Sequence, residues 1–263
     1  NNVIRRNNVK AYRMPFNLAT GALNNSIMNN RFESVTSYSE IITSSNNNII
    51  ENNSIASGTA NGDLGIFLQY SDGNRIRYNN ISSGDDGIRL TSSSNNIVEH
   101  NNITVLNTGT NTNFGIYFYR LSNNNRIVNN TIQSASDHNI RIWSSFDNLI
   151  ENNTLSNSDD YGIYLEEGSE GNIIKTNIIS DNTDDGIYLT SSNNNQIISN
   201  NISSNTNGIT IINSFGNKIQ WNDIYDNSGI GLNLGDAVTG GSTLLNGELV
   251  DNIISNSATN DIV

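Results

Sequence analysis

The sequence predicts an all-β protein: a single-stranded, right-handed parallel β-helix, or solenoid, of about 11 coils of 22–30 residues with three parallel sheets. A motif with the skeleton Asn-x-Ile-x-x-Asn-x-Ile recurs from one end of the chain to the other, and such a fixed period indicates a repeat architecture. A second element, Gly-Ile-x-Leu, follows most copies of the motif. No apolar pattern of helical period lies between the two elements, which leaves only short strands.

The recurring motif is expected to supply two of the three strands of each coil. Residues 148–155, with the sequence NLIENNTL, are a clear copy, and successive copies begin 22 to 30 residues apart. A weaker eleventh copy begins at Gly247. The other copies begin at Asn2, Asn25, Asn48, Asn74, Asn96, Asn125, Asn148, Asn172, Asn195 and Asn217.

The sixth position of the motif is asparagine in every copy, between two apolar positions. An amide side chain has both a donor and an acceptor, so identical asparagines stacked on successive coils are expected to form a hydrogen-bonded ladder. Asparagine also tolerates the left-handed backbone of a tight corner, so we expect a strand, an asparagine corner and a second strand. The ladder residues are Asn7, Asn30, Asn53, Asn79, Asn101, Asn130, Asn153, Asn177, Asn200, Asn222 and Asn252.

The third strand of each coil is predicted at the Gly-Ile-x-Leu element, as at residues 87–90 and 162–165. Its alternation places Ile and Leu inward and the residue between them outward. Glycine lets the chain enter the strand from a turn at low steric cost. Residues 139–142 fill the same place with asparagine instead of glycine.

Composition limits the classes of partner. The net charge of −12 disfavours nucleic acid, which is itself a polyanion. There are no cysteines, hence no disulfides or thiolate metal sites, and no apolar run is long enough to span a membrane. We expect one domain over residues 1–263, a fragment or module of a longer surface protein. Because both ends of the sequence lie inside a coil, end-to-end self-association is also expected.

The outward positions of the third strand carry candidate glycan-binding residues. Flat aromatic rings beside hydrogen-bonding groups suit the C–H faces of sugars. The alternative interpretation is that aromatic and arginine neighbours on adjacent strands only stabilise the sheet. The candidates are Arg89, Tyr117, Tyr119, Arg120, Arg141, Trp143, Tyr164 and Glu166.

Acidic residues gather in the turn before this strand. Asp137 and His138 precede one strand, and Asp159 and Asp160 precede the next. Neighbouring coils lie roughly 5 Å apart, so these residues are candidate catalytic groups with the carboxylate spacings of glycosidases. The alternative interpretation is that Asp is an ordinary turn residue.

Asp181, Asp184 and Asp185 are candidate calcium ligands, because carboxylate oxygens in a turn suit this ion. Their spacing matches no fixed calcium loop. The prediction is therefore that no cofactor is required, with calcium as the optional ion. The chain has 2 histidines, in different coils, which argues against a histidine-built copper or zinc site.

The two repeated elements resemble those of the parallel β-helix proteins of the pectin-lyase-like superfamily, especially NosD-like repeats of microbial surface and secreted proteins. The resemblance extends over essentially the whole chain and implies the fold. The superfamily includes lyases, hydrolases, epimerases, adhesins and scaffolds, so the resemblance does not fix the function. The Asp-Asp-Gly-Ile elements also resemble the paired aspartates of polygalacturonases, but the further elements of those enzymes do not follow in the expected order.

Two functional hypotheses remain open. The first is an extracellular or cell-surface structural or adhesive module that contacts a polysaccharide or cell-surface glycan. The second is a polysaccharide-active enzyme, a lyase, hydrolase or epimerase, that uses the acidic cluster around Asp137 and His138. End-to-end regularity favours the first hypothesis, and the acidic cluster favours the second.

Overall fold

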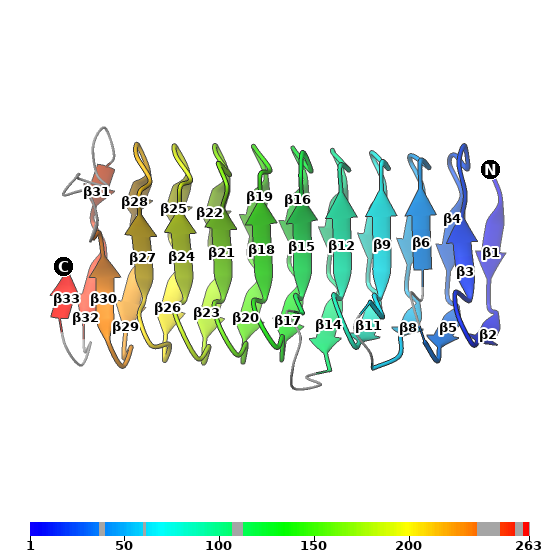
Figure 1. Cartoon of the computed structure of the whole chain (residues 1–263), viewed down its shortest axis with the longest axis horizontal. Coiled ribbons are helices and arrows are strands. Elements are labelled where there is room, and N and C mark those ends of the chain that lie inside the picture. Colours follow the sequence, from blue (N-terminus) through cyan, green and yellow to red (C-terminus); the bar gives the residue numbers. More distant parts are fainter. Residues whose placement is uncertain (37–39, 60–61, 107–112, 236–247, 256–259, 263) are drawn as a thin grey trace.

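The computed structural model describes residues 1–36, 40–59, 62–106, 113–235, 248–255 and 260–262. In Figure 1 these residues form one row of stacked coils that runs from the N-terminus to the C-terminus. The strands form three sheets of 11 strands each, and neighbouring strands run parallel, as in the pairing of β10 with β13. The predicted all-β parallel β-helix with three sheets is confirmed. In the described part of the chain, no helix has the length and apolarity needed to cross a membrane.

Sheets A and B are built from the two halves of the motif. Sheet A contains, in spatial order, β1 (Val3–Arg5), β4 (Ser26–Met28), β7 (Ile49–Glu51), β10 (Arg75–Arg77), β13 (Ile97–Glu99), β16 (Arg126–Val128), β19 (Leu149–Glu151), β22 (Ile173–Lys175), β25 (Gln196–Ile198), β28 (Lys218–Gln220) and β31 (Glu248–Val250). Sheet B contains β2 (Asn8–Ala11), β5 (Arg31–Ser34), β8 (Ser54–Ala56), β11 (Asn80–Ser83), β14 (Asn102–Val105), β17 (Thr131–Gln133), β20 (Thr154–Ser156), β23 (Ile178–Ser180), β26 (Asn201–Ser203), β29 (Asp223–Tyr225) and β32 (Ile253–Ser255).

Sheet C is built from the Gly-Ile-x-Leu strands and carries the candidate site. It contains β3 (Phe16–Leu18), β6 (Glu40–Thr43), β9 (Ile66–Gln69), β12 (Ile88–Thr91), β15 (Ile116–Tyr119), β18 (Ile140–Trp143), β21 (Ile163–Glu166), β24 (Ile187–Thr190), β27 (Ile209–Ile212), β30 (Ile230–Asn233) and β33 (Asn260–Ile262).

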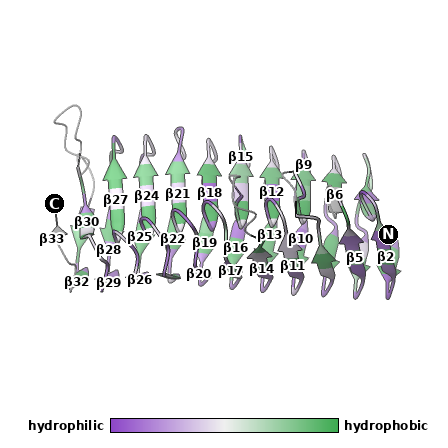
Figure 2. Ribbon diagram, turned by 60° about the horizontal axis from the view of Figure 1, so that its bottom comes forward, coloured by the Kyte–Doolittle hydropathy of each residue, from purple (hydrophilic) through white to green (hydrophobic). Residues whose placement is uncertain are grey.

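A continuous apolar interior runs the length of the solenoid. Ile150 of β19 pairs in register with Ile127 and Ile174 on the neighbouring coils, and all three side chains are fully buried. In Figure 2 the strands of sheet C, such as β12, β18 and β27, are predominantly hydrophobic in colour. Because a shift of one residue would turn these apolar side chains outward, the stack fixes the register that aligns the outer faces.

The asparagines at the sixth motif position form a buried ladder. The backbone N–H and the side-chain amide of Asn101 donate to Asn130 Oδ1 at 2.9 and 3.0 Å. Asn130 in turn donates in the same way to Asn153 Oδ1. The same two-bond step repeats from Asn7 to Asn252. Each asparagine from Asn30 to Asn222 also donates to a backbone carbonyl of the preceding coil, as Asn130 does to Val98 O at 2.9 Å, and so bonds the coils on both sides.

The left-handed corner falls one residue earlier than the sequence predicted. The residue with positive φ is the fifth position of the motif, such as Tyr78 (φ 56°), Asn129 (φ 58°) and Trp221 (φ 57°). The predicted asparagine corner is therefore wrong in this detail. The ladder asparagine is selected by its hydrogen bonds and not by backbone strain, because a tyrosine or tryptophan occupies the strained position.

A second asparagine ladder begins each copy of the motif. The backbone N–H of Asn125 donates to Asn148 Oδ1 at 2.8 Å, and that of Asn148 donates to Asn172 Oδ1 at 2.9 Å. A serine ladder lies in the same turn, where the backbone N–H of Ser122 donates to Ser145 Oγ at 3.2 Å. A buried polar ladder thus lies at each end of the strands of sheet A. The two ladders hold successive coils in register.

Candidate functional site

The outer face of sheet C brings the predicted glycan-binding residues together. They come from four neighbouring strands, β12, β15, β18 and β21, with Arg120 in the turn that follows β15. The strand register aligns the others in two columns, with Arg89, Tyr117, Arg141 and Tyr164 in one and Thr91, Tyr119, Trp143 and Glu166 in the other.

Arg141 lies at the centre of this face. Its guanidinium carbon lies 5.0 Å from the ring centroid of Phe114, 5.2 Å from that of Tyr117 and 5.1 Å from that of Trp143. Tyr119 and Trp143 contact each other edge to face at 5.0 Å. Planar guanidinium groups stack favourably on aromatic rings, so Arg141 holds the surrounding rings in one arrangement.

Glu166 fixes the orientation of Arg141. Arg141 Nε donates to Glu166 Oε1 at 2.7 Å, and a second guanidinium nitrogen donates to the same oxygen. The hydroxyl of Tyr164 donates to the other carboxylate oxygen of Glu166 at 2.9 Å. The positive charge at the centre of the face is therefore already paired.

Exposure divides the aromatic residues into two groups. Tyr117 stands on the outer face but is only 6% exposed, because Arg89, Arg141 and Phe114 cover it. Burial raises its pKa far above the usual range. Tyr119 is half-buried, and so is its neighbour on the next coil, Trp143. The accessible aromatic surface of this face therefore belongs to Tyr119, Trp143 and the likewise half-buried Tyr164, and not to Tyr117.

A shallow depression adjoins these rings on the N-terminal side. Its volume is about 350 Å³, in the range of small-molecule sites. It is lined by Phe67, Gln69, Arg89, Thr91, Tyr117 and Tyr119.

Arg89, the cation of the depression, is also paired. Arg89 Nε lies 2.5 Å from Asp86 Oδ2, and Asp85 Oδ2 lies 3.9 Å from the guanidinium. Asp86 is fully buried and accepts a bond from the backbone N–H of Phe114 at 3.0 Å. Burial outweighs the attraction of Arg89 and raises the pKa of Asp86 to about 7.

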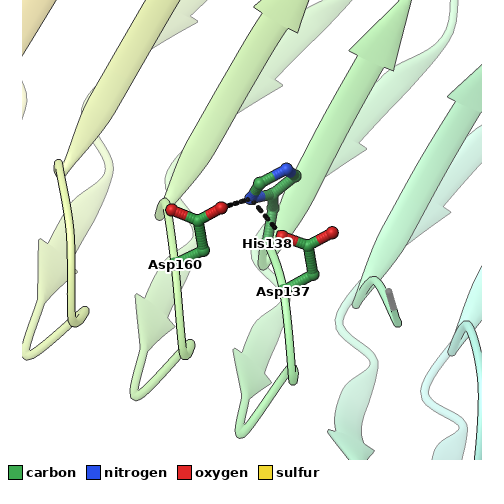
Figure 3. A group of neighbouring side chains, drawn as sticks. All are labelled: Asp137, His138 and Asp160. Carbon is green, nitrogen blue, oxygen red and sulfur yellow. Dashed lines mark ion pairs between the residues drawn. The ribbon is translucent and has the colours of Figure 1, made fainter. Parts of the chain in front are cut away.

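The second candidate region is the turn beside the first column, where Asp137, His138 and Asp160 meet (Figure 3). His138 Nδ1 lies 3.2 Å from Asp137 Oδ1 and 3.5 Å from Asp160 Oδ2. The backbone N–H of Tyr161 also points to Nδ1, at 3.4 Å. An N–H donor at Nδ1 favours the tautomer with its hydrogen on Nε2, so a lone pair faces the two carboxylates.

Aromatic rings enclose His138. The rings of Phe114 and Tyr161 stack against the imidazole from the two neighbouring coils, at 5.4 and 5.1 Å, and Tyr164 meets its edge at 4.9 Å. Burial, with a smaller effect from Arg141, lowers the pKa of His138 to about 3. The imidazole is thus neutral at physiological pH.

The two carboxyl groups act as one proton-holding unit. Burial is the main cause that raises the pKa of Asp160 to about 7, and its hydrogen bond with Asp137 and the nearby charges of Asp184 and Asp185 add to the effect. Burial also raises the pKa of Asp137. Like charges in contact disfavour double ionisation, so the pair takes up its first proton at a higher pH than a free aspartate does.

The local sequence of this turn departs from the repeat. Glycine normally precedes the strand: a Cβ at Gly115 would lie 2.1 Å from Ile132 Cγ2. Asn139 occupies that place, and its side-chain amide donates to Asn182 Oδ1 at 2.9 Å. At neighbouring glycines, the atoms that a Cβ would meet are an isoleucine Cγ2 and an asparagine amide of the next coil, as at Gly162. The coil after Asn139 carries Leu155 and Ser158 at these two positions.

Other predicted residues lie outside this cluster. The side chain of Asp159 is exposed and is not among the converging atoms. Asp181 is exposed at a left-handed turn position (φ 58°). Asp185 is buried and accepts from the side chain of Asn207. Within the described ranges, the group of three such residues whose ligand atoms lie within 4.8 Å of one another is Asp137, His138 and Asp160. Calcium binding at Asp181, Asp184 and Asp185 stays a prediction.

The sequence interpretation missed the aromatic residues of the turn. Phe114 and Tyr161 occupy the same repeat position as His138, directly before the Gly-Ile-x-Leu element, and Tyr188 stacks on Tyr161 at 4.7 Å. Aligning the residue before each of these strand elements, including the one that begins at Asn139, would have shown two aromatic residues and a histidine on consecutive coils. That signal was available from the repeat alone.

The ladders and the three parallel sheets define a parallel β-helix repeat protein. Residues 1–155 match the family model "Right handed beta helix region", and residues 107–263 match "Periplasmic copper-binding protein (NosD)". The chain therefore belongs to the right-handed β-helix repeat family of the pectin-lyase-like type, with a NosD-like second part. No curated protein matches the chain.

Solved structures share the fold at low sequence identity. The A-module of the mannuronan C-5 epimerase AlgE4 of Azotobacter vinelandii is 13% identical, with a TM-score of 0.76 over 99% of this chain and 88% of that one. The periplasmic alginate epimerase AlgG is 18% identical, with a TM-score of 0.72 over 91% of this chain. The chain spans 66% of the length of that epimerase. The Dettilon tailspike protein is 15% identical, with a TM-score of 0.65 over 99% of this chain and 62% of that one.

The donor atoms do not fit the copper site that the NosD description suggests. Copper sites in proteins are built on imidazoles and sulfur ligands, and the chain has no cysteine. His100 stacks on Tyr78, and its Nε2 faces the side-chain amide of Asn129 at 3.4 Å. His138 lies in a different turn and offers one nitrogen beside two carboxylates. The two histidines therefore do not share a ligand set.

Proposed function

We propose that this protein is an extracytoplasmic β-helix protein that binds a polysaccharide along the outer face of sheet C. One observation carries the proposal. Aromatic rings and arginines stand in register on consecutive coils, beside a depression of about 350 Å³. Concave sites with apolar walls and a few polar groups are the usual form of small-molecule sites.

The exposed part of the face suits a sugar ring. Tyr119 and Trp143 offer half-exposed aromatic surface on which a C–H face of a sugar stacks. Glu166 lies next to Trp143 in the same column and supplies an acceptor for sugar hydroxyls. Stacking and polar groups thus stand side by side, as orientation of a saccharide requires.

Known structures with this fold support a polysaccharide ligand. They include an alginate epimerase, a mannuronan C-5 epimerase, the Dettilon tailspike protein and a tailspike of bacteriophage CBA120. The alginate epimerase and the NosD family are described as periplasmic, which supports a periplasmic or extracellular location. Fold similarity at this level of identity supports the class of ligand and not a particular activity.

The ladders support a structural or adhesive role as well. Each coil is bonded to the next at both ends of the sheet A strands. The solenoid therefore presents the glycan face on a rigid support. Association of coil ends into a longer assembly is part of this proposal. Light scattering over a range of protein concentrations checks it, and a particle of constant monomer mass would contradict it.

Acid–base catalysis is the second candidate function, and Asp160 carries it. Its pKa of about 7 suits a group that gives and takes a proton near neutral pH. Glycosidases place their two carboxyl groups about 5–9.5 Å apart in separate roles, whereas carboxylate oxygens of Asp137 and Asp160 lie within 4.8 Å of each other. The pair would therefore serve as one general acid or base, with His138 accepting beside it. Reducing-sugar and unsaturated-product assays over a polysaccharide panel test this candidate.

Affinity electrophoresis and a glycan array test the binding proposal. The substitution Trp143→Ala removes stacking area, and we expect binding to weaken several-fold, since a stacked aromatic contributes about 1 kcal/mol. Trp221→Ala is the matched control, because Trp221 is 54% exposed at a corner between sheets A and B. Equal binding by both variants, or no binding by wild type to any glycan, would refute the proposal.

A further inference from the structure

We infer that the polysaccharide held by this face is uncharged and is not a polyuronate. The inference rests on the proposed function and concerns the chemical class of the ligand. It follows from the pairing of the arginines that face the ligand. A site for an acidic sugar needs a guanidinium or ammonium group that is free to bind the carboxylate.

The central cation of the face is not free. Arg141 is bound through two nitrogens to Glu166, and the side chains of the pair are 19% and 15% exposed. Tyr164 holds the other oxygen of Glu166 at 2.9 Å. A sugar carboxylate that approached Arg141 would meet the charge of Glu166 beside it, in a partly desolvated place where repulsion is strong.

The cation of the depression is paired from below. Arg89 is bound to the buried carboxyl of Asp86 at 2.5 Å and lies 3.9 Å from Asp85. Asp85 is also buried, at 3% exposure. Two acidic groups therefore face one guanidinium, so the depression carries no surplus positive charge.

The remaining charges around the face are mainly acidic. Arg120 is exposed in the turn after β15, 4.9 Å from the ring of Tyr119, and no ion pair to it is found in the described residues. Asp159 and Asp184 lie in the turns beside Asp160, and the chain as a whole carries a net charge of −12. One exposed arginine does not offset this field.

The inference separates this face from those of the alginate and mannuronan epimerases that share its fold, since alginate and mannuronan are polyuronates. It also narrows the second candidate function. β-Elimination and C5 epimerisation of uronates remove a proton from the carbon beside the carboxylate. An uncharged chain lacks that activated proton, so any chemistry by Asp137 and Asp160 on it would be hydrolysis.

The test compares uncharged hexans with polyuronates of matched length, by affinity electrophoresis and calorimetry at low and high salt. For the wild type we expect an uncharged hexan to bind, with polyuronates roughly tenfold weaker at low salt. Glu166→Gln keeps an acceptor for Tyr164 and frees the charge of Arg141. We expect this variant to gain roughly tenfold in affinity for polyuronates at low salt and to lose that gain at high salt.

Glu167→Gln is the matched control, because it changes the net charge equally at an exposed turn position. Tighter binding of a polyuronate than of every uncharged glycan by the wild type would overturn the inference and leave the proposed function standing. No gain by Glu166→Gln over Glu167→Gln would also overturn it. Failure of the wild type to bind either class would overturn the proposed function itself.

Discussion

Replacing Asn130 by leucine tests how much the asparagine ladder contributes to stability. Asn130 is 1% exposed. Its Oδ1 accepts from the backbone N–H of Asn101 at 2.9 Å. Its side-chain amide donates to Val98 O at 2.9 Å, to Val128 O at 3.2 Å and to Asn153 Oδ1 at 3.1 Å. Leucine has nearly the same shape and can form none of these bonds.

The expected cost is about 2–4 kcal/mol. The backbone N–H of Asn101 loses its acceptor in a buried place, which costs about 1–3 kcal/mol, and each lost side-chain bond adds about 1 kcal/mol. The apolar surface of the leucine offsets part of this loss. The other partners are less affected, because the side-chain amide of Asn101 still bonds Ile76 O and Asn153 Oδ1 still accepts from the backbone N–H at residue 130.

Urea denaturation measures the change as a lower midpoint at constant slope. Hydrogen exchange locates it, since solenoids also open locally, and the amide of Asn101 should lose the most protection. Asn102→Leu is the control: Asn102 is exposed on β14 and donates one side-chain bond, to Asn80 at 3.0 Å. We expect that control to stay within about 0.5 kcal/mol of wild type. A cost for Asn130→Leu no greater than that of the control would refute the ladder's energetic role.

Two further predictions concern the turn before the strands of sheet C. Asp160 has a pKa raised from 3.8 to about 7 in the folded state, so its contribution to stability is complete below pH 4 and is lost as the pH rises towards 7. The stability of Asp160→Asn relative to wild type should therefore increase as the pH rises through this window. Urea midpoints at several pH values measure this difference. A difference between the two proteins that does not change with pH would contradict the prediction. Gly115→Ala would place a Cβ 2.1 Å from Ile132 and 2.5 Å from the carbonyl of Asn139 and should cost about 1–3 kcal/mol in thermal unfolding. Gly168→Ala, with nothing within 4 Å, should cost about 1 kcal/mol from backbone strain alone, and equal costs would contradict the steric argument.

The fold and the columns of sheet C could be predicted because both follow from the period of the sequence. Ile88, Ile116 and Ile140 occupy equivalent interior positions, so their outward neighbours must lie side by side on adjacent coils. The observed strand register confirms this alignment. The position of the left-handed residue could not be read from composition. Asparagine suits both a left-handed corner and a hydrogen-bonded ladder. The hydrogen bonds in the structure show that the invariant sixth position belongs to the ladder and not to the corner.

The electrostatic state of the site could not be predicted, because it depends on pairing between columns. Arg141 and Glu166 belong to different columns and different coils, and the sequence offers Arg141 several neighbours at similar separations. The same holds for Asp137 and Asp160, whose contact depends on the shape of two turns. Ion pairing neutralises two of the three arginines of the face, Arg89 and Arg141, which changes the expected ligand.

In a solenoid of similar coils, a departure from the repeat that needs a second, compensating change is stronger evidence for a site than an exposed residue is. Outward residues vary without disturbing the core, so aromatic columns alone leave structural laddering as an alternative. Asn139 is different, because its place needs glycine on neighbouring coils, where a Cβ would meet an isoleucine Cγ2 of the next coil. The coil after Asn139 carries Leu155 at that isoleucine position and the small Ser158 where later coils carry asparagine. The turn with this paired exception also holds Asp137 and His138. Local rules are broken most often where function requires it, so this turn is where the polysaccharide-binding face should be tested first for chemistry.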